Sequence, residues 1–442
     1  MNNFISPSAN RNKITRAAPE IALFLAAAVL LLAGLSRSSI QGSHEDMIAE
    51  PAHEAAVNGH WWILVYKGKP RLQKPPLANW AVAASYIVTG RENAFTTHLP
   101  SAILALAGIG VAYLFGRKLY GRTGGLIFGL CLATMPFFLF LAARPTTDAY
   151  LAFFVFLCFY LFYLFCANGS RAALFGFYAA LAAAFMSKGP VAVAIVVPAA
   201  ALFLLLTRRF SLLKNRRHIW GALLFLALAM PWPVSVALTV PDAARIWLRE
   251  GFSRYGSALH GHSRSVYFYA KFVPLFTLPW LPFLVTGAIN FRRWFAPPRR
   301  DGIAFFLTWL VWGFTFFSLC DEKKVNYILP LAAPVAMIAA GYCAHILING
   351  AGKALRAVLL VTAVFFAATG IGVAAFALSH FKISAKVACG GGWAAVTGVC
   401  IVCGVWLFIS ALKRLYVSSV AAIAAGGAGC YLVGVLIYLP NA

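Results

Sequence analysis

Charged residues are scarce in this chain, and acidic residues are scarcer still. Only 11% of the 442 residues are Asp, Glu, Lys or Arg, and only 12 residues are acidic. A soluble globular domain carries about 25% charged residues. Apolar residues make up 62% of the chain, and the mean hydropathy is +0.80. This composition excludes a soluble enzyme and indicates a protein that crosses a membrane several times.

Cysteines at the spacings of a disulfide framework are also lacking. Most of the nine cysteines lie inside apolar stretches, which excludes a secreted disulfide scaffold. Cys400 and Cys403 form a C-x-x-C pair, but it lies in an apolar run, so we interpret both as core residues. The net charge of +25 would indicate nucleic acid only in a soluble protein. Here the charges cluster between apolar runs, so we expect membrane lipids as partners and no nucleic acid.

Long apolar runs are abundant. A membrane-spanning helix needs about 20 predominantly apolar residues, and thirteen runs approach that length. The sequence therefore predicts an all-α polytopic membrane protein with about 13 transmembrane helices. The first run lacks a clear small-residue cleavage site, so we do not expect a cleaved signal peptide. The expected spans are 20–36, 97–116, 123–142, 149–167, 172–187, 190–206, 219–239, 271–289, 303–319, 325–347, 356–378, 392–411 and 418–439.

The short loops predict the orientation of the chain. When the spans alternate, five basic clusters and the N-terminal arm fall on one side, which the positive-inside rule makes cytoplasmic. Ten of the twelve acidic residues fall on the other side, all but Glu20 and Asp301. Two outer segments are long, 37–96 and 240–270, and we expect interfacial helices in the first. The basic clusters are 117–122, 208–217, 292–300, 353–356 and 413–414.

The unusual polar residues lie at the outer ends of the predicted spans, whereas the span centres hold almost no charge. A transporter is expected to carry charges near the membrane midplane. An enzyme working at the outer interface would carry them where they are found. Taken singly, each segment also fits an ordinary interfacial loop or helix end. The segments are 43–62, 74–76, 144–148, 186–190, 249–269 and 319–334.

Carboxylates and lysines in these segments suit transfer of a sugar from a phosphate. Glu45 or Asp46 could act as a general base, or stabilise a sugar that develops positive charge. Lys74 precedes two prolines and could bind a phosphate as a point charge. Asp148 could cap the helix that it begins.

Arginines and histidines gather among tyrosines in segment 249–269, a composition that suits an anionic, sugar-bearing ligand. His260 and His262 are candidates for a divalent metal, but two histidines are too few to specify one.

Seven short motifs follow one another in a fixed order along the chain. They begin just after the first span and end within the run 325–347. The motifs are Glu45 with Ala49-Glu50, Glu54 and Gly59-x-Trp61; K-P-P-L at 74–77; Arg144 with Asp148; K-G-P at 188–190; P-W at 231–232; E-x-x-x-R-Y at 250–255; and K-x-x-Y-x-L-P at 324–330.

This series resembles the GT-C superfamily of membrane glycosyltransferases, in the branch of lipid A aminoarabinose transferase and the protein O-mannosyltransferases. The resemblance covers residues 20–346 and implies a catalytic domain at 1–350, followed by helices of unknown role at 351–442. It implies a polyprenyl-phosphate-linked sugar donor, a lipid or glycolipid acceptor such as lipid A, and inverting transfer. It also implies a cavity at the outer face of the bacterial inner membrane. No cofactor is required by the resemblance, and a divalent metal stays open.

The resemblance also implies roles for single residues. Glu45 is the expected base or electrostatic catalyst, and Asp148 is a second acidic partner. Such enzymes stabilise the charge that builds on the departing lipid phosphate. The residues expected to hold the donor or acceptor phosphate are Lys74, Arg144, Lys188, Arg254, Lys324 and Tyr327.

Two positions depart from the family pattern. His44 stands where the first acid is usually Asp, and Gln73 stands where a Glu commonly precedes K-P-P. The acid of the reaction would then be Glu45, Asp46 or His44 itself. The amide at Gln73 weakens any metal site carried over from the family. If the acceptor is a phosphate, its oxygen is already deprotonated and a base is unnecessary.

Three alternatives stay open at this stage. A protein O-mannosyltransferase-like enzyme would be suggested by a large soluble outer domain, which the sequence lacks. A lipid-sugar transporter predicts polar span centres and repeated halves, and neither is found. A non-catalytic paralogue is motivated by the departures at His44 and Gln73.

Overall fold

The structure is a computed structural model that describes residues 7–33, 35, 43–248, 265–294, 300–350, 352–381, 390–433 and 435. Within these ranges, the side chains of 7–16, 43–44, 293, 376–381 and 390–394 are not described. The described residues are mostly helical, as the apolar runs predict. They also include one two-stranded hairpin that the sequence analysis did not anticipate.

The first half of the chain alternates long helices with a short, polar outer region. Its elements are α1 (Pro7–Ala33), α2 (Ser43–Asn58), β1 (Val65–Tyr66), β2 (Lys69–Pro70), α3 (Leu77–Thr89), α4 (Ala94–Ala133), α5 (Pro136–Ala142), α6 (Thr147–Asn168), α7 (Arg171–Lys188) and α8 (Val191–Leu206).

The second half contains more broken helices. Its elements are η1 (Phe210–Lys214), α9 (Arg217–Ala229), α10 (Pro231–Thr239), η2 (Val266–Tyr269), α12 (Val273–Thr277), α13 (Leu281–Ile289), α14 (Phe291–Trp294), α15 (Arg300–Leu319), η3 (Val325–Leu331), α16 (Ala332–Ile348), α17 (Gly352–Phe381), α18 (Gly390–Lys413) and α19 (Tyr416–Val433).

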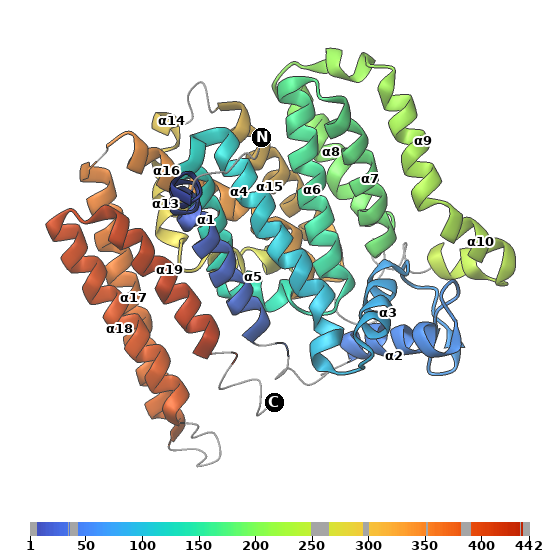
Figure 1. Cartoon of the computed structure of the whole chain (residues 1–442), viewed down its shortest axis with the longest axis horizontal. Helices are drawn as coiled ribbons and strands as arrows, with labels where there is room; N and C mark the ends of the chain where they lie inside the picture. The colour runs from blue at the N-terminus through green and yellow to red at the C-terminus, as the bar shows by residue number, and fades with distance from the viewer. Residues whose placement is uncertain are drawn as a thin grey trace.

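The helices form one bundle (Figure 1), and the region between α1 and α4, called the polar region below, lies at one end of it. Helices α17, α18 and α19 lie at one side of the bundle and α7, α8 and α9 at the other. Helices α2 and α3 and the hairpin lie together with α10 at the lower end in Figure 1. The short helices predicted within segment 37–96 correspond to α2 and α3.

Local sequence signals begin and end the helices around this polar region. Pro76 precedes α3, and Gly90 ends it in the left-handed conformation (φ 63°). Asn93 and Thr96 form a reciprocal capping box at the start of α4. The Thr146 hydroxyl accepts from the Ala149 N–H and caps α6. Asp148 was a candidate for that capping role, and the structure gives the role to Thr146.

Helix α4 turns back on itself at Gly121, where φ is 69°. A Cβ on Gly116 would lie 2.5 Å from the Gly124 carbonyl oxygen, and one on Gly125 would lie 2.9 Å from the Tyr113 carbonyl oxygen. Residues 12 apart on a straight helix are about 18 Å apart, yet the Gly116 position contacts the Phe128 ring. The two halves therefore pack antiparallel through glycines, as the separate runs 97–116 and 123–142 predict.

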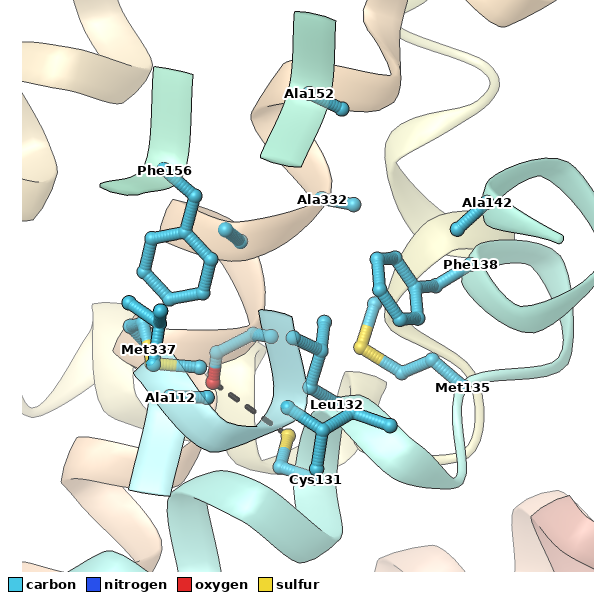
Figure 2. Close-up of a cluster of buried hydrophobic side chains, with 14 of the residues drawn as sticks. Ala112, Cys131, Leu132, Met135, Phe138, Ala142, Ala152, Phe156, Ala332 and Met337 are labelled. Atoms are coloured by element: carbon cyan, nitrogen blue, oxygen red, sulfur yellow. Dashed lines mark hydrogen bonds between the residues drawn. The ribbon is translucent and has the colours of Figure 1, made fainter. Parts of the chain in front are cut away.

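The core beneath the polar region is formed by α4, α5, α6 and α16. Figure 2 shows apolar side chains from these four helices packed together, among them Leu132, Phe138, Phe156 and Met337. The Cys131 thiol donates to the Ala336 carbonyl oxygen at 3.5 Å in the same cluster (Figure 2). Such dense packing holds the ends of α5 and α6 in place below the polar region.

The C-terminal helices pack against this core through close backbone contacts. A Cβ on Gly427 of α19 would lie 2.2 Å from the Thr134 carbonyl oxygen and 2.9 Å from Pro279. The indole N–H of Trp280 donates to the Thr134 hydroxyl at 3.0 Å. In the packing of α17–α19, Cys400 and Cys403 are buried, which agrees with their interpretation as core residues.

The predicted count of about 13 transmembrane helices is not confirmed. Seven of the described helices are long and apolar enough to span a membrane, or nine if each of two bent pairs is one span. The bent pairs are α9–α10 (44°) and η2/α12–α13 (114°). The four remaining predicted runs are the returning half of α4, the shorter apolar segments Ala17–Ala33 and α8, and α7, whose 18 residues begin at Arg171 and end at Lys188.

The end of the bundle opposite α2 and α3 gathers basic residues and both of the inner acids. Arg122 forms an ion pair with Glu20 at 2.6 Å, and Arg209 pairs with Asp301. Lys118 donates to the Asn168 side chain at 3.5 Å, so the turn of α4 and the end of α6 meet there. Two of the five predicted basic clusters, 117–122 and 208–217, therefore lie beside the two acidic residues that were predicted on the same side.

We predict that Gly116→Ala destabilises the protein, although alanine is the better helix former. The added methyl group meets the backbone of Gly124 at 2.5 Å, and overpacking of this kind typically costs about 1–3 kcal/mol. Gly110→Ala in the same helix is the control, because its nearest atom is a Phe24 ring carbon at 3.8 Å. Thermal unfolding in detergent should show a lower midpoint for Gly116→Ala alone. An unchanged midpoint would contradict the packing of the α4 halves.

Candidate functional site

A polar cavity of about 680 Å³ lies beside α2, the hairpin and the ends of α6 and α7. Its described lining carries six cationic and two acidic side chains. The lining side chains come from six short segments between residues 47 and 327. They are Met47 and Ile48; Tyr66, Lys67, Lys69, Pro70 and Arg71; Gln73 and Lys74; Thr146, Thr147 and Asp148; Lys188; and Glu322, Lys324, Asn326 and Tyr327.

A second cavity of about 250 Å³ adjoins the first and is mostly apolar. Aromatic rings of Phe185, Trp232, Trp247, Phe316 and Phe317 contribute to its wall. Five side chains line both cavities and so mark the place where they meet: Gln73, Lys74, Lys188, Glu322 and Tyr327.

Asp148 and Lys188 form a buried ion pair at this junction. Asp148 lies in the first turn of α6 and Lys188 in the last turn of α7, and they are only 5% and 8% exposed. The Lys188 ammonium donates to the Asp148 carboxylate and lies 4.0 Å from the centre of the Tyr327 ring. A carboxylate at a helix N-terminus and a cation at a C-terminus both oppose the helix dipoles favourably. Lys188 is thus held in place by Asp148 of α6 and by Tyr327.

Glu45 lies in α2 behind the polar cavity, whose described lining it does not join. It is 4% exposed and lies between two cationic or protonatable groups. Arg144 Nε is 3.6 Å from one carboxylate oxygen, and His98 Nε2 is 3.8 Å from the other. His98 Nδ1 is 2.7 Å from the Ala94 carbonyl oxygen, which can only accept, so Nδ1 carries a proton. A favourable contact of Nε2 with Glu45 then needs one further proton on the ring or the carboxyl group.

The segment before α16 brings another network to the junction. Glu322 accepts from the Tyr327 hydroxyl at 3.2 Å and pairs with the Lys324 ammonium at 3.3 Å. The Tyr269 hydroxyl donates to the Lys324 carbonyl oxygen at 3.1 Å, which ties this segment to η2. Glu322 therefore orients both Lys324 and Tyr327 toward the polar cavity.

The position of Lys74 is set by the two prolines that follow it in the chain. Pro75 and Pro76 are buried, and α3 begins directly after them. A Cβ on Gly189 would lie 3.9 Å from the Pro75 ring, so the K-P-P and K-G-P motifs are neighbours in space. Gly189 has a φ of 79°, a conformation that glycine adopts without strain. The two motifs together place Lys74 and Lys188 at the same junction.

Tryptophan side chains fix the outer loop 61–72 to the later part of the chain. The indole N–H of Trp232 donates to the Trp62 carbonyl oxygen at 2.9 Å, and that of Trp247 donates to the Leu72 carbonyl oxygen at 2.7 Å. Trp80 donates to the Trp61 carbonyl oxygen, and its ring stacks on that of Trp62 at 5.9 Å. The walls of both cavities are thus joined by hydrogen bonds from indole rings.

The structure brings most of the predicted site residues together. Lys74, Asp148, Lys188, Lys324 and Tyr327 all line the polar cavity. Glu45 and Arg144 lie behind it as an ion pair, and Asp46 is half-buried outside both described linings. Predictions for the His44 side chain, Arg254, His260 and His262 concern residues outside the described part of the structure.

A metal centre finds no support in the part of the chain that the structure describes. Within it, no group of three or more His, Cys, Asp or Glu side chains is placed to hold a metal ion. Gln73 lines both cavities and offers an amide there instead of a carboxylate.

Sequence reasoning missed several residues of the polar cavity. The hairpin residues Lys67 and Lys69 and the buried Arg71 were not identified as site residues. Their signal was the Lys-Gly-Lys-Pro-Arg sequence at 67–71, where a basic turn directly precedes Lys74. His98 was also missed, because only its contact with Glu45 distinguishes it from any other histidine near a helix start.

Comparison with known proteins agrees with this architecture. The family model of dolichyl-phosphate-mannose-protein mannosyltransferase matches residues 73–234. The chain is 27% identical to the undecaprenyl phosphate-α-4-amino-4-deoxy-L-arabinose arabinosyl transferase of Shewanella sediminis, over 78% of this chain and 63% of that protein. It is 27% identical to the enzyme of the same name from Erwinia tasmaniensis, over 89% of this chain and 73% of that protein. The chain therefore spans less than two thirds of the length of the Shewanella relative.

The fold is also found among solved structures. The crystal structure of ArnT from Cupriavidus metallidurans bound to undecaprenyl phosphate superposes with a TM-score of 0.78 at 23% identity, covering 96% of this chain and 77% of that one. The protein is thus a multi-pass membrane protein with the fold of that ArnT structure. Within that class it resembles ArnT and the aminoarabinose transferases.

The Asp148–Lys188 pair predicts a strongly non-additive mutant series. Asp148→Asn or Lys188→Met leaves one buried charge without its partner, which typically costs about 3–5 kcal/mol of unfolding free energy. The double variant removes both charges. It should lose less unfolding free energy than the two single variants lose together, with a coupling energy of about 0.5–3 kcal/mol. Unfolding by SDS in mixed micelles would measure the unfolding free energy of the wild type, the two single variants and the double variant. Additive losses would show that the two side chains do not depend on each other.

Proposed function

We propose that this protein is a glycosyltransferase that moves a sugar from a polyprenyl-phosphate donor to a lipid or glycolipid acceptor, such as lipid A. The observation that carries the proposal is the position of Lys74 and Lys188, which line both the polar and the apolar cavity. A polyprenyl-phosphate sugar has its anionic group between an apolar chain and a polar sugar. The apolar cavity, the two lysines and the polar cavity follow one another in that same order.

The donor fits this arrangement with its prenyl chain against the aromatic wall of the smaller cavity. Its phosphate would lie at the junction, near Lys74 and Lys188, and its sugar would extend into the polar cavity. Charge-assisted hydrogen bonds from lysines are stronger than neutral ones and stabilise a phosphate that gains charge. The names of the Shewanella and Erwinia relatives specify undecaprenyl phosphate with an amino sugar, which supports the same donor class here.

The chemistry that follows is an inverting displacement at the anomeric carbon. An acceptor oxygen forms the new bond to this carbon as the bond to the donor phosphate oxygen breaks. The electron pair leaves with the polyprenyl phosphate, whose added charge faces Lys74 and Lys188. If the acceptor group is a phosphate, its attacking oxygen is already ionised and no proton has to be removed.

Among the carboxylates, Asp148 is better placed than Glu45 to contact a substrate. Asp148 lines the polar cavity, whereas Glu45 lies behind it between Arg144 and His98. We therefore infer that Asp148 stabilises the positive charge that develops on the sugar. Glu45 and Arg144 act as positioning residues, because they join α2 to the segment before α6. In this assignment, Asp46 and His44 are no longer the first candidates for the acid of the reaction.

The remaining cationic and aromatic candidates keep supporting roles. Lys324 and Tyr327 face the polar cavity and are oriented by Glu322, so both can contact the donor or acceptor phosphate. Arg254 remains a predicted phosphate ligand on the grounds of sequence alone. Residues 351–442 are proposed to support the catalytic domain by packing, through α19, on Thr134 and Pro279.

The acceptor and the orientation are part of the same proposal. A cavity with six cations and two acids favours an anionic glycolipid over the neutral hydroxyl group of a protein. The basic loops at the opposite end of the bundle favour a cytoplasmic location for that end. The cavities would then open at the periplasmic face of the bacterial inner membrane, with the N-terminus in the cytoplasm.

We predict that Lys74→Ala weakens undecaprenyl phosphate binding at least tenfold and lowers sugar transfer in parallel. Loss of one hydrogen bond to a charged group typically costs about 1.5–3 kcal/mol, which corresponds to tenfold or more in affinity. The purified full chain in nanodiscs would be assayed with a set of radiolabelled undecaprenyl-phosphate sugars and with lipid A. Lys353→Ala is the matched control, because Lys353 is exposed at the start of α17. Transfer from none of these donors by the folded wild type would contradict the proposal.

A comparison of Asp148→Asn with Glu45→Gln tests the assignment of the two acids. We expect Asp148→Asn to lower kcat by about 100-fold or more, within the range of a group that acts on the reacting atoms. Glu45→Gln should lower kcat by about tenfold, because its effect passes through Arg144 and His98. Both variants should retain undecaprenyl phosphate binding, which shows that they are folded. A larger loss in Glu45→Gln would reverse the assignment.

A further inference from the structure

Arg71 is a buried cation that faces the polar cavity, and no carboxylate of the described residues pairs with it. Its side chain lines the cavity and is only 7% exposed. Nη1 donates to the Asn79 side-chain oxygen at 3.2 Å, and no other side-chain hydrogen bond of Arg71 occurs among the described residues. Burial lowers the pKa of Arg71 to about 10, so the group is still protonated at neutral pH. A guanidinium group carries five donors, and a buried charge needs a partner of opposite sign.

The position of Arg71 is fixed by its surroundings. The Asn79 amide donates to the carbonyl oxygens of Met47 and Ile48 at 3.2 and 3.0 Å, so its oxygen is left to accept from Arg71. The Arg71 backbone N–H donates to the Leu64 carbonyl oxygen at 2.7 Å. Arg71 is therefore held between α2, α3 and the hairpin before any ligand binds, which favours binding because little side-chain entropy is lost.

Two lysines of the hairpin belong to the same part of the cavity. Lys67 and Lys69 line it on the hairpin that runs directly into Arg71. The Glu50 carboxylate accepts from the Lys67 backbone N–H at 2.6 Å and so holds the turn, where Lys67 has a φ of 50°. No described carboxylate forms an ion pair with Lys67, Lys69 or Arg71, although both acids of the cavity lining form one, Asp148 with Lys188 and Glu322 with Lys324.

These three cations are separate from the group proposed for the donor. Lys74 and Lys188 line both cavities, whereas Lys67, Lys69 and Arg71 line the polar cavity only. A lipid phosphate at the junction would leave the hairpin group without an anion. Planar guanidinium groups bind phosphate oxygens two at a time, with lysines adding point charge.

We infer that Arg71, with Lys67 and Lys69, binds a phosphate group carried by the acceptor, in the part of the polar cavity that does not border the apolar one. This inference rests on the proposed function and adds to it the side chains that would recognise a phosphorylated glycolipid acceptor. Glu50 is the positioning residue that holds the hairpin turn at this site.

Direct binding tests this site without any need for sugar transfer. The full chain in phosphatidylcholine nanodiscs would be titrated with bisphosphorylated lipid A, fully dephosphorylated lipid A, undecaprenyl phosphate and phosphatidylglycerol. We expect the wild type to bind bisphosphorylated lipid A at least tenfold more tightly than the dephosphorylated form. Arg71→Gln should abolish this preference while changing the Kd for undecaprenyl phosphate by less than twofold. Lys74→Ala should show the opposite pattern.

Further variants keep the test decisive if Arg71→Gln fails to fold. The double variant Lys67→Gln/Lys69→Gln alters two exposed side chains and leaves the Arg71–Asn79 hydrogen bond in place. It should raise the Kd for bisphosphorylated lipid A several-fold. Arg71→Lys should retain an intermediate preference. Arg91→Gln, an exposed arginine between α3 and α4, is the matched control and should behave as the wild type.

Three outcomes would overturn the inference. The first is equal binding of both forms of lipid A by the wild type. The second is an equal loss of undecaprenyl phosphate and lipid A binding in Arg71→Gln. The third is equal competition by phosphatidylglycerol, which would identify a site for lipid headgroups in general. Failure of the proposed function looks different. In that case no sugar is transferred by the wild type, whereas Arg71-dependent binding of phosphorylated lipid A persists.

Discussion

The buried ion pair between Asp148 and Lys188 is the interaction around which the polar end of the molecule is organised. Either charge alone would be costly so deep in a membrane protein, so the start of α6 and the end of α7 must meet. The Tyr327 ring then covers the lysine from η3, and both cavities border the pair. One electrostatic requirement thus determines the relative position of three elements and of the junction between the cavities.

Below this end, the bundle depends on close approach of backbones. Lipid gives helices little hydrophobic reason to associate, so contact must come from packing of small residues. The glycines of α4 allow its two halves to meet, and Gly427 allows α19 to approach Thr134. This packing keeps the ends of the helices at fixed distances. The cation positions at the cavity can therefore be precise although they come from segments far apart in sequence.

The sequence was sufficient for the class of fold and for four residues that line the polar cavity. Lys74, Asp148, Lys188 and Tyr327 stand in short motifs that contain proline or glycine, residues that constrain or free the local chain path. Arg71 could not be predicted, because its burial depends on the contact of Asn79 with α2, which no local pattern reveals. The count of spans was also beyond composition, since the turn of α4 at Gly121 and the bends at Met230 and near Pro279 do not change the hydropathy of the apolar runs.

The indole hydrogen bonds between the outer loop and the later helices also affect how the molecule is made. Trp232 and Trp247 bond to carbonyl groups that precede them by 170 and 175 residues. Synthesis runs from the N-terminus, so the ribosome completes the loop 61–72 long before it adds either partner. The carbonyl groups of this loop therefore stay hydrated while several helices insert into the membrane. Closure of the cavity walls is therefore a late event in biogenesis, and it carries the entropy cost of long-range contacts.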